Sequence, residues 1–100
     1  MHAVVDHFNI KSAADWDTLC AKVEQFQSEL NEPEFRGLAL VRTGPTEAAA
    51  FVLYENGAAL ERISRDIAGP WFAEHVRQYI EGPMNRTVGE IVAGTLHPDL

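Results

Sequence analysis

Residues 35–54 read FRGLALVRTGPTEAAAFVLY. Gly44-Pro45 is a turn signal, and it separates two runs, 35–43 and 48–54, that are rich in apolar, β-branched and aromatic residues. Two such runs on either side of a short turn predict an antiparallel hairpin of two strands. The other elements can be arranged around this hairpin.

The residues before the hairpin predict a strand followed by a helix. Residues 2–10, HAVVDHFNI, have the composition of a strand, with Val4, Asp6, Phe8 and Ile10 on one face and Ala3, Val5, His7 and Asn9 on the other. Ser12 and Asp15 resemble a capping box. The apolar residues that follow recur at helical spacing: Trp16, Leu19, Cys20, Val23, Phe26 and Leu30. Asn31 and Pro33 end this predicted helix.

The residues after the hairpin predict a second helix and a last strand. Asn56-Gly57 breaks the preceding strand, and residues 58–67 place apolar side chains at helical spacing. Gly69-Pro70 then interrupts the pattern, so we expect the second helix to be broken in two there. The second piece stops at Gly82-Pro83, and TVGEIVAGT at residues 87–95 predicts the final strand.

The predicted elements follow the order β-α-β-β-α-β over residues 1–100. This order is typical of α+β ferredoxin-like domains, whose antiparallel sheet carries its helices on one face. One hundred residues suffice for one core and not for two, and neither a linker nor an internal repeat divides the chain. The sequence therefore predicts a single domain.

The hairpin strands are apolar on both faces. The alternating sets are Leu38 and Leu40 against Ala39 and Val41, and Phe51 and Leu53 against Ala50 and Val52. One helical layer covers only one face of a sheet, and a bare apolar face of several hundred Å² is unusual on a soluble monomer. We therefore expect a symmetric homodimer that packs sheet against sheet.

The charge of the chain excludes some classes of partner. Fifteen acidic and eight basic side chains give a net charge of −7, and no Lys/Arg run offsets it. That sign repels phosphate backbones and anionic membrane surfaces. No apolar run approaches the roughly 20 residues that span a bilayer. We expect neither nucleic-acid binding nor a membrane segment.

The single cysteine and the first residues favour a reducing, cytoplasmic setting. Cys20 has no second cysteine to form an internal disulfide, and we expect it to be buried on its helix. The start, MHAVVDHFNI, lacks the basic and apolar regions of a signal peptide.

The motif PEFRGLALVR at residues 33–42, together with the element order, resembles the dimeric α+β barrel superfamily. Within it, the chain looks most like the antibiotic biosynthesis monooxygenase family, through residues 35–42, 51–55 and 70–76 and over essentially its whole length. The resemblance implies a cofactor-independent monooxygenase acting on an aromatic or polycyclic small molecule. Such an enzyme deprotonates its substrate, and the resulting carbanion reduces O2.

The haem-degrading branch of the superfamily offers a second comparison. It uses a helix histidine as the axial iron ligand, and His75 in WFAEH falls at that place. Its first-strand asparagine matches His7, or Asn9 if the register slips by two. Its helix tryptophan is missing here, because Ile63 and Ser64 occupy that neighbourhood. Haem is therefore the third alternative, behind an enzyme that needs no cofactor and a binding domain.

Three polar residues are the predicted catalytic groups. His75 is the candidate base or proton donor, although a histidine beside Glu74 on a helix also fits a solvent-exposed role. His7 and Asn9 share a strand face and could orient a substrate carbonyl. Either that face or the face of Val4, Phe8 and Ile10 looks into the space between sheet and helices, and the sequence leaves both open.

Three aromatic residues are the predicted substrate-binding groups. Trp71 and Phe72 would form cavity walls, and Tyr79 would hydrogen-bond a phenolic substrate. Trp71 also fits a core or dimer-interface anchor, and the position of Tyr79 beside Val76 favours the core first. Arg77 and Arg86 could hold a carboxylate or be ordinary surface arginines.

The candidate residues leave two main functions open, a monooxygenase and a non-catalytic dimeric domain that binds a small molecule. The binding domain needs only an apolar cavity. A cavity that excludes both His7 and His75 would count heavily against catalysis. A metal held by protein ligands alone is not predicted, since the four histidines form no H-x-x-x-H motif.

Overall fold

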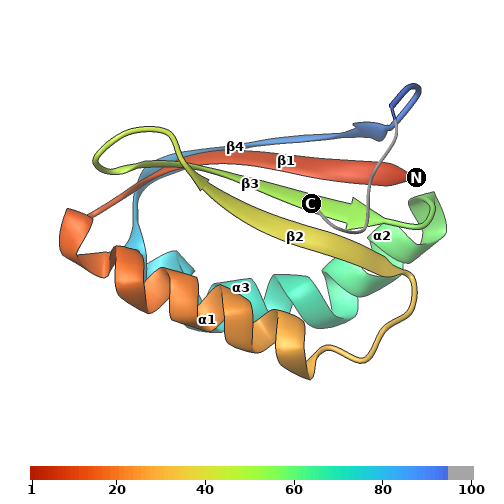
Figure 1. Ribbon diagram of the computed structural model, residues 1–100, viewed down its shortest axis with the longest axis horizontal. Helices are drawn as coiled ribbons and strands as arrows, with labels where there is room; N and C mark the ends of the chain where they lie inside the picture. Colours follow the sequence, from red (N-terminus) through yellow and green to blue (C-terminus); the bar gives the residue numbers. More distant parts are fainter. Residues whose placement is uncertain (95–100) are drawn as a thin grey trace.

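The computed structural model describes residues 1–94 as one antiparallel sheet covered on one face by a layer of helices (Figure 1). The elements are β1 (His2–Ile10), α1 (Trp16–Glu29), β2 (Phe35–Arg42), β3 (Glu47–Tyr54), α2 (Gly57–Ile63), α3 (Gly69–His75) and β4 (Ile80–Glu90). The strands lie in the order β2-β3-β1-β4. The ferredoxin-like fold and the hairpin of β2 and β3 predicted from the sequence are confirmed.

The turn of the hairpin is tied to the start of α1. The Trp16 indole N–H donates to the Pro45 carbonyl at 2.8 Å, and the Arg42 guanidinium lies 5.1 Å from the centre of the Trp16 ring. Ser12 caps the short 3-10 turn before α1 by accepting from the backbone N–H of Ala14. Cys20 is exposed, so its predicted burial is wrong. It lies one residue beyond Leu19, which turns its side chain away from the sheet.

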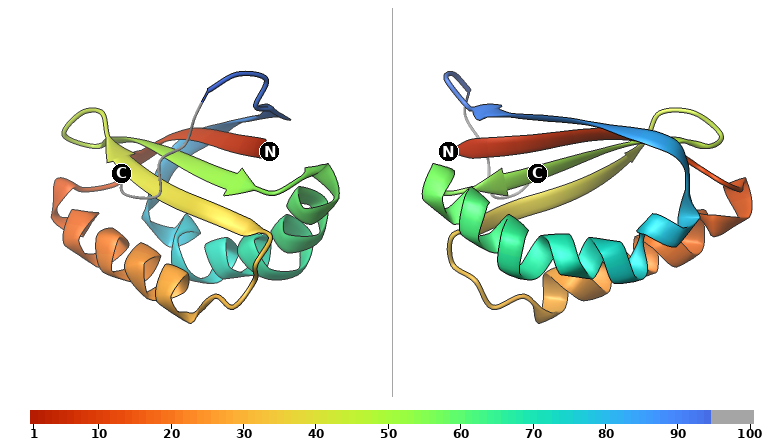
Figure 2. Two further views of the ribbon diagram at one scale, coloured as in Figure 1. Left: turned by 45° about the vertical axis from the view of Figure 1, so that its right-hand side comes forward. Right: turned by 180° about the vertical axis from the view of Figure 1, so that it is seen from behind.

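The second helix is not broken at Gly69-Pro70. A π-helical turn, Ser64–Ala68, joins α2 to α3, and the chain stays helical from one to the other (Figure 2). The backbone N–H of Gly69 donates to the carbonyl of Ser64, five residues back. Pro70 lies in the first turn of α3, where a missing N–H is tolerated.

Gly69 is required by the close approach of its backbone to Ser64. A Cβ at residue 69 would lie 2.5 Å from the Ser64 carbonyl oxygen, whereas a Cβ at Gly89 would meet nothing within 4 Å. We expect Gly69→Ala to lower the free energy of unfolding by roughly 1–3 kcal/mol, as overpacking does elsewhere. Urea denaturation measures it, with Gly89→Ala as the matched control. Equal losses in the two variants would contradict this account of the π turn.

The last strand begins seven residues earlier than predicted. It spans Ile80–Glu90 and not 87–95, and residue 95 lies outside the described residues. Gly82, with φ of 74°, and Pro83 lie at a bulge, since His7 pairs with Asn85 and Asn9 with Glu81. Proline is tolerated at bulges and on edge strands, and β4 is an edge strand. The turn signal therefore marks a bulge inside the strand.

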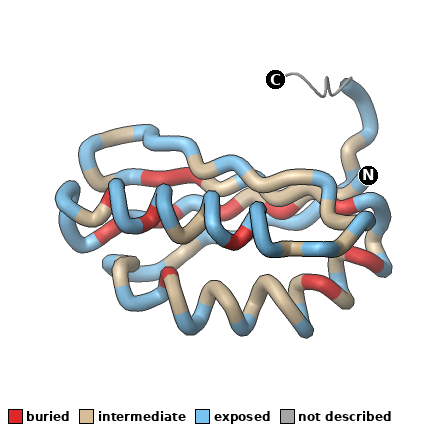
Figure 3. The backbone as a smooth tube through the Cα atoms, turned by 60° about the horizontal axis from the view of Figure 1, so that its bottom comes forward, coloured by how far each residue is buried: buried red, intermediate tan, exposed pale blue. Residues whose placement is uncertain are grey.

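The core between sheet and helices consists of two clusters of buried residues. One contains Phe8, Ile10, Trp16, Leu19, Ala48 and Val76, and the other contains Val4, Tyr54, Ala59 and Ile63. Buried residues occur in strands and helices alike (Figure 3). Val4 and Phe8 belong to different clusters although they share one face of β1, so the division falls at Asp6 between them.

Candidate functional site

A cavity of about 170 Å³ lies between the sheet and the helices, where the two core clusters meet. Its walls are mainly aromatic and aliphatic, among them Phe8, Phe26, Phe35, Leu40, Trp71 and Phe72. The Trp71 ring packs edge-on against Phe26, with ring centres 4.4 Å apart. An engineered apolar cavity of about 150 Å³ in another protein holds benzene, so this space suits a ligand of one or two rings.

The polar part of the cavity centres on Asp6. This residue is 4% exposed and carries the one buried charge in the part of the chain that the structure describes. Arg86 donates from Nε to Asp6 Oδ1 at 2.8 Å and from Nη2 to Oδ2 at 3.1 Å. These hydrogen bonds raise the pKa of the Arg86 guanidinium. The Arg86 side chain is 46% exposed, so the pair reaches from the cavity to its edge along β4.

Tyr54 adds a second polar group to the same cavity. Its side chain is 1% exposed, and its phenol oxygen accepts a hydrogen bond from the Ser64 hydroxyl at 3.2 Å. Burial raises the pKa of Tyr54, which keeps the phenol protonated at neutral pH and able to donate its own proton to a ligand. Ser64 opens the π turn, so the irregular helix positions a cavity group.

The raised pKa of Tyr54 predicts a pH dependence of stability. The folded protein holds the phenol proton more tightly than the unfolded chain, in which the pKa is about 10. The stabilisation is complete below pH of about 10 and is lost as the pH rises through the higher pKa of the folded protein. We expect the free energy of unfolding to fall faster above pH of about 10 in the wild type than in Tyr54→Phe. Parallel curves from urea titrations would contradict the burial effect.

The structure places two of the three predicted substrate-binding residues in the cavity wall and the third outside it. Trp71 and Phe72 line the cavity, as predicted for walls. Tyr79 does not line it; its side chain packs against the first core cluster, and its carbonyl accepts from the N–H of Lys11 at 2.8 Å. The roles of these three residues in binding stay predictions.

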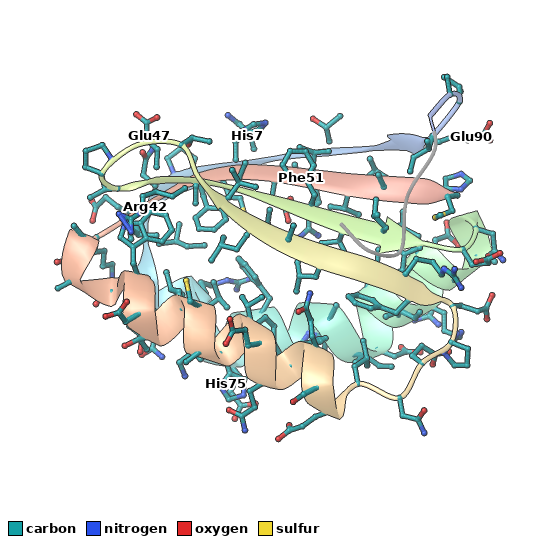
Figure 4. All side chains as sticks on the ribbon, in the orientation of Figure 1. His7, Arg42, Glu47, Phe51, His75 and Glu90 are labelled. Atoms are coloured by element: carbon teal, nitrogen blue, oxygen red, sulfur yellow. The ribbon has the colours of Figure 1, made fainter. Side chains whose placement is uncertain are left out.

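The predicted catalytic residues lie outside the cavity. His7 and Asn9 are exposed on the face of the sheet away from the helices, because the other face of β1 carries Val4, Asp6 and Phe8 inward. His75 lies on the outer side of the helical layer, in a groove with Lys22, Glu29 and Trp71. Figure 4 shows His7 and His75 on opposite sides of the molecule. The cavity excludes both His7 and His75, which counts against catalysis by these residues, so a reaction in the cavity would have to rest on other groups.

The cavity does not fit haem held by a histidine. Its lining contains no histidine in the described part of the chain. The Nε2 atom of His75 lies 3.8 Å from a Glu74 carboxylate oxygen in the outer groove. We therefore derive no step through haem iron.

The sequence does not single out two of the groups that carry the polar chemistry of the cavity, Asp6 and Tyr54. It places Asp6 on a strand face and Tyr54 at the end of a strand, whereas Arg86 is already a candidate ligand contact. The signal for Asp6 is a charge on an otherwise apolar strand face, flanked by Val4 and Phe8. A charge at such a position is buried and needs a partner.

Residues 1–94 contain no group of three His, Cys, Asp or Glu side chains placed to hold a metal ion. None of the helices in that range has the length and apolar character needed to cross a membrane.

The fold is similar to that of several solved structures. A protein of unknown function from Nitrosomonas europaea matches with a TM-score of 0.75 and 16% identity over 96% of this chain and 93% of its own. SnoaB, a cofactor-independent oxygenase from Streptomyces nogalater, matches with a TM-score of 0.68 and 15% identity over 97% and 96%. An antibiotic biosynthesis monooxygenase matches with a TM-score of 0.71 and 14% identity over 93% and 100%.

These likenesses confirm the predicted fold, which this chain shares with SnoaB and with the antibiotic biosynthesis monooxygenase that it matches. At such low sequence identities, these likenesses establish a shared fold but do not establish a shared activity. No family model matches the sequence, and no curated protein matches it.

Proposed function

We propose that the protein is a cytoplasmic, cofactor-independent monooxygenase that oxidises a hydroxylated aromatic molecule of one or two rings with O2. The observation that carries this proposal is the apolar cavity with a buried carboxylate, Asp6, and a buried phenol, Tyr54, in its wall. Apolar walls hold an aromatic substrate, and a few placed polar groups orient it. The shared fold with SnoaB, described as a cofactor-independent oxygenase, supports the reaction type.

The proposed reaction starts from the keto tautomer of the substrate, with removal of a proton from the ring CH2 that the conjugated carbonyl activates. Asp6 accepts that proton, and the Tyr54 hydroxyl donates to the oxygen on which negative charge develops. The carbanion gives its electrons to O2 and forms a carbon–oxygen bond, and the peroxide takes a proton. The hydroperoxide then loses water, so that CH2 and O2 become C=O and H2O. No external reductant is needed.

The test is O2 consumption by the purified protein with quinols and anthrone-type substrates of one to three rings. We expect turnover with one- and two-ring substrates and little with three-ring ones, because the cavity holds about 170 Å³. His75→Ala and His7→Ala should keep activity within about twofold, since neither residue reaches the cavity. Absence of O2 consumption above the uncatalysed rate with every substrate would leave the non-catalytic binding domain as the function.

We also propose that the protein forms a homodimer through the outer face of its sheet. The sheet face away from the helices carries Val5, Ala39, Val41, Phe51 and Leu53, and Phe51 is 40% exposed at its centre (Figure 4). An exposed apolar face is covered most simply by a second copy of the chain related by a twofold axis. His7 and Asn9 lie on this face and would then be interface residues.

Phe51→Arg should convert the dimer to a monomer. A charge at the centre of the apolar face would have no partner when two copies meet, and its burial would cost several kcal/mol. Light scattering at micromolar concentration measures the mass of wild type and variant. Glu90→Arg, an exposed change at the end of β4, serves as the control and should remain dimeric. A monomeric wild type would overturn the proposed dimer.

A further inference from the structure

The charged groups around the cavity give it a positive sign. Of the residues that line it, Asp6 is the acidic one, whereas Arg77 and Arg86 are both basic. The chain as a whole carries −7, so the local charge opposes the sign of the protein. The charge of Asp6 is already neutralised by Arg86 through two hydrogen bonds. The positive charge of Arg77 therefore has no acidic counterpart among the lining residues.

Arg77 differs from the other arginines in its contacts. Arg36, Arg62, Arg65 and Arg86 form ion pairs, and Arg42 stacks on Trp16. Within residues 1–94, Arg77 is the arginine with neither kind of partner. It lies in the short 3-10 turn, Arg77–Tyr79, between α3 and β4, and it lines the cavity beside Phe72 and Val76.

We infer that the cavity binds a monoanionic aromatic molecule of one or two rings, with its charged oxygen on Arg77. The rings would lie among the aromatic walls, and a neutral hydroxyl would face the Asp6–Arg86 pair and Tyr54. A guanidinium offers planar donors that suit such an oxyanion, and charge-assisted hydrogen bonds are the stronger kind. The inference rests on the proposed function in that it names the substrate class of the same cavity.

The anionic oxygen could belong to a carboxylate or to an ionised ring hydroxyl. Three ligands of similar size distinguish these two possibilities. They are 2-naphthoate, 2-naphthol and the neutral 2-naphthamide, titrated calorimetrically without turnover. We expect 2-naphthoate to bind roughly tenfold more tightly than 2-naphthamide at neutral pH. If the hydroxyl is the source, 2-naphthol affinity should instead rise as the pH approaches about 10, where phenol-type groups ionise.

The deciding variant is Arg77→Gln. It should weaken binding of the preferred anion roughly five- to tenfold and leave 2-naphthamide unchanged. Arg36→Gln is the matched control, because it removes one positive charge at an exposed ion pair that does not line the cavity. Circular dichroism verifies that both variants are folded.

Equal affinity for the charged and neutral probes would overturn the inference, as would equal effects of Arg77→Gln and Arg36→Gln. Failure of all three probes to bind would overturn it as well. Tight binding of 2-naphthoate, without O2 consumption in the presence of any substrate, would overturn the proposed monooxygenase and support the anion site. Turnover of neutral quinols, with equal affinity for the anionic and neutral probes, would support the monooxygenase and overturn the anion site.

Discussion

Arg86→Met should lower the free energy of unfolding by about 3 kcal/mol. The substitution leaves the Asp6 carboxylate buried without its two hydrogen bonds from the guanidinium. Breaking a buried pair from one side costs roughly 3–5 kcal/mol in other proteins, and the partial exposure of Arg86 places this case at the lower end. Urea denaturation of wild type and variant measures the difference.

Two further variants identify the cause. Asp6→Leu combined with Arg86→Met removes both charges and should recover stability to within about 1 kcal/mol of the wild type. Arg36→Met removes an exposed pair with Glu55, at 3.5 Å, and should change stability by no more than roughly 0.5 kcal/mol. If Arg86→Met costs no more than Arg36→Met, the buried carboxylate is not held by this pair.

Tyr54→Phe should lower kcat about 100-fold with any substrate that the protein oxidises. The change removes the hydroxyl that would donate to the developing oxyanion, and loss of one such donor costs other enzymes about 10²–10³ in kcat. The loss of the Ser64 hydrogen bond should cost only about 1 kcal/mol of stability, so the variant should fold. O2 consumption at saturating substrate measures the effect.

Tyr79→Phe is the matched control for this prediction. It makes the same chemical change at the tyrosine that the sequence names as a substrate-binding candidate, but that side chain lies outside the cavity. We expect its kcat to stay within about twofold of the wild type. The reverse order, with Tyr79→Phe the more damaging variant, would show that the site lies elsewhere.

Local pattern was sufficient for the order of the elements. The spacing of Trp16, Leu19 and Phe26 predicts α1, and these three are the buried residues of that helix. The same spacing wrongly predicted burial of Cys20, which is exposed. Cys20 lies at the border of the apolar stripe, where a rotation of the helix by a few tens of degrees decides whether a side chain faces the core or the solvent. The burial of such a border residue depends on the partner surface.

Gly-Pro pairs show a second limit of local pattern. Gly82-Pro83 predicts a stop, yet β4 continues through it because pairing with β1 holds both flanks of the bulge. Gly69-Pro70 predicts a break, yet the helix continues because the π turn accommodates it. Tertiary pairing outweighs the local turn preference at Gly82-Pro83, whereas at Gly69-Pro70 the change in hydrogen bonding lies within the helix itself.

The sequence by itself determined the order of the strands and helices, and that the hairpin strands are apolar on both faces, because those properties depend on periodicity within a short segment. Only the tertiary structure decided which face of β1 meets the helices, and hence that Asp6 and not His7 lines the cavity. It also brought Arg86 to Asp6, 80 residues away in the chain. Strand order and register set such meetings, and both follow from how whole elements pack together.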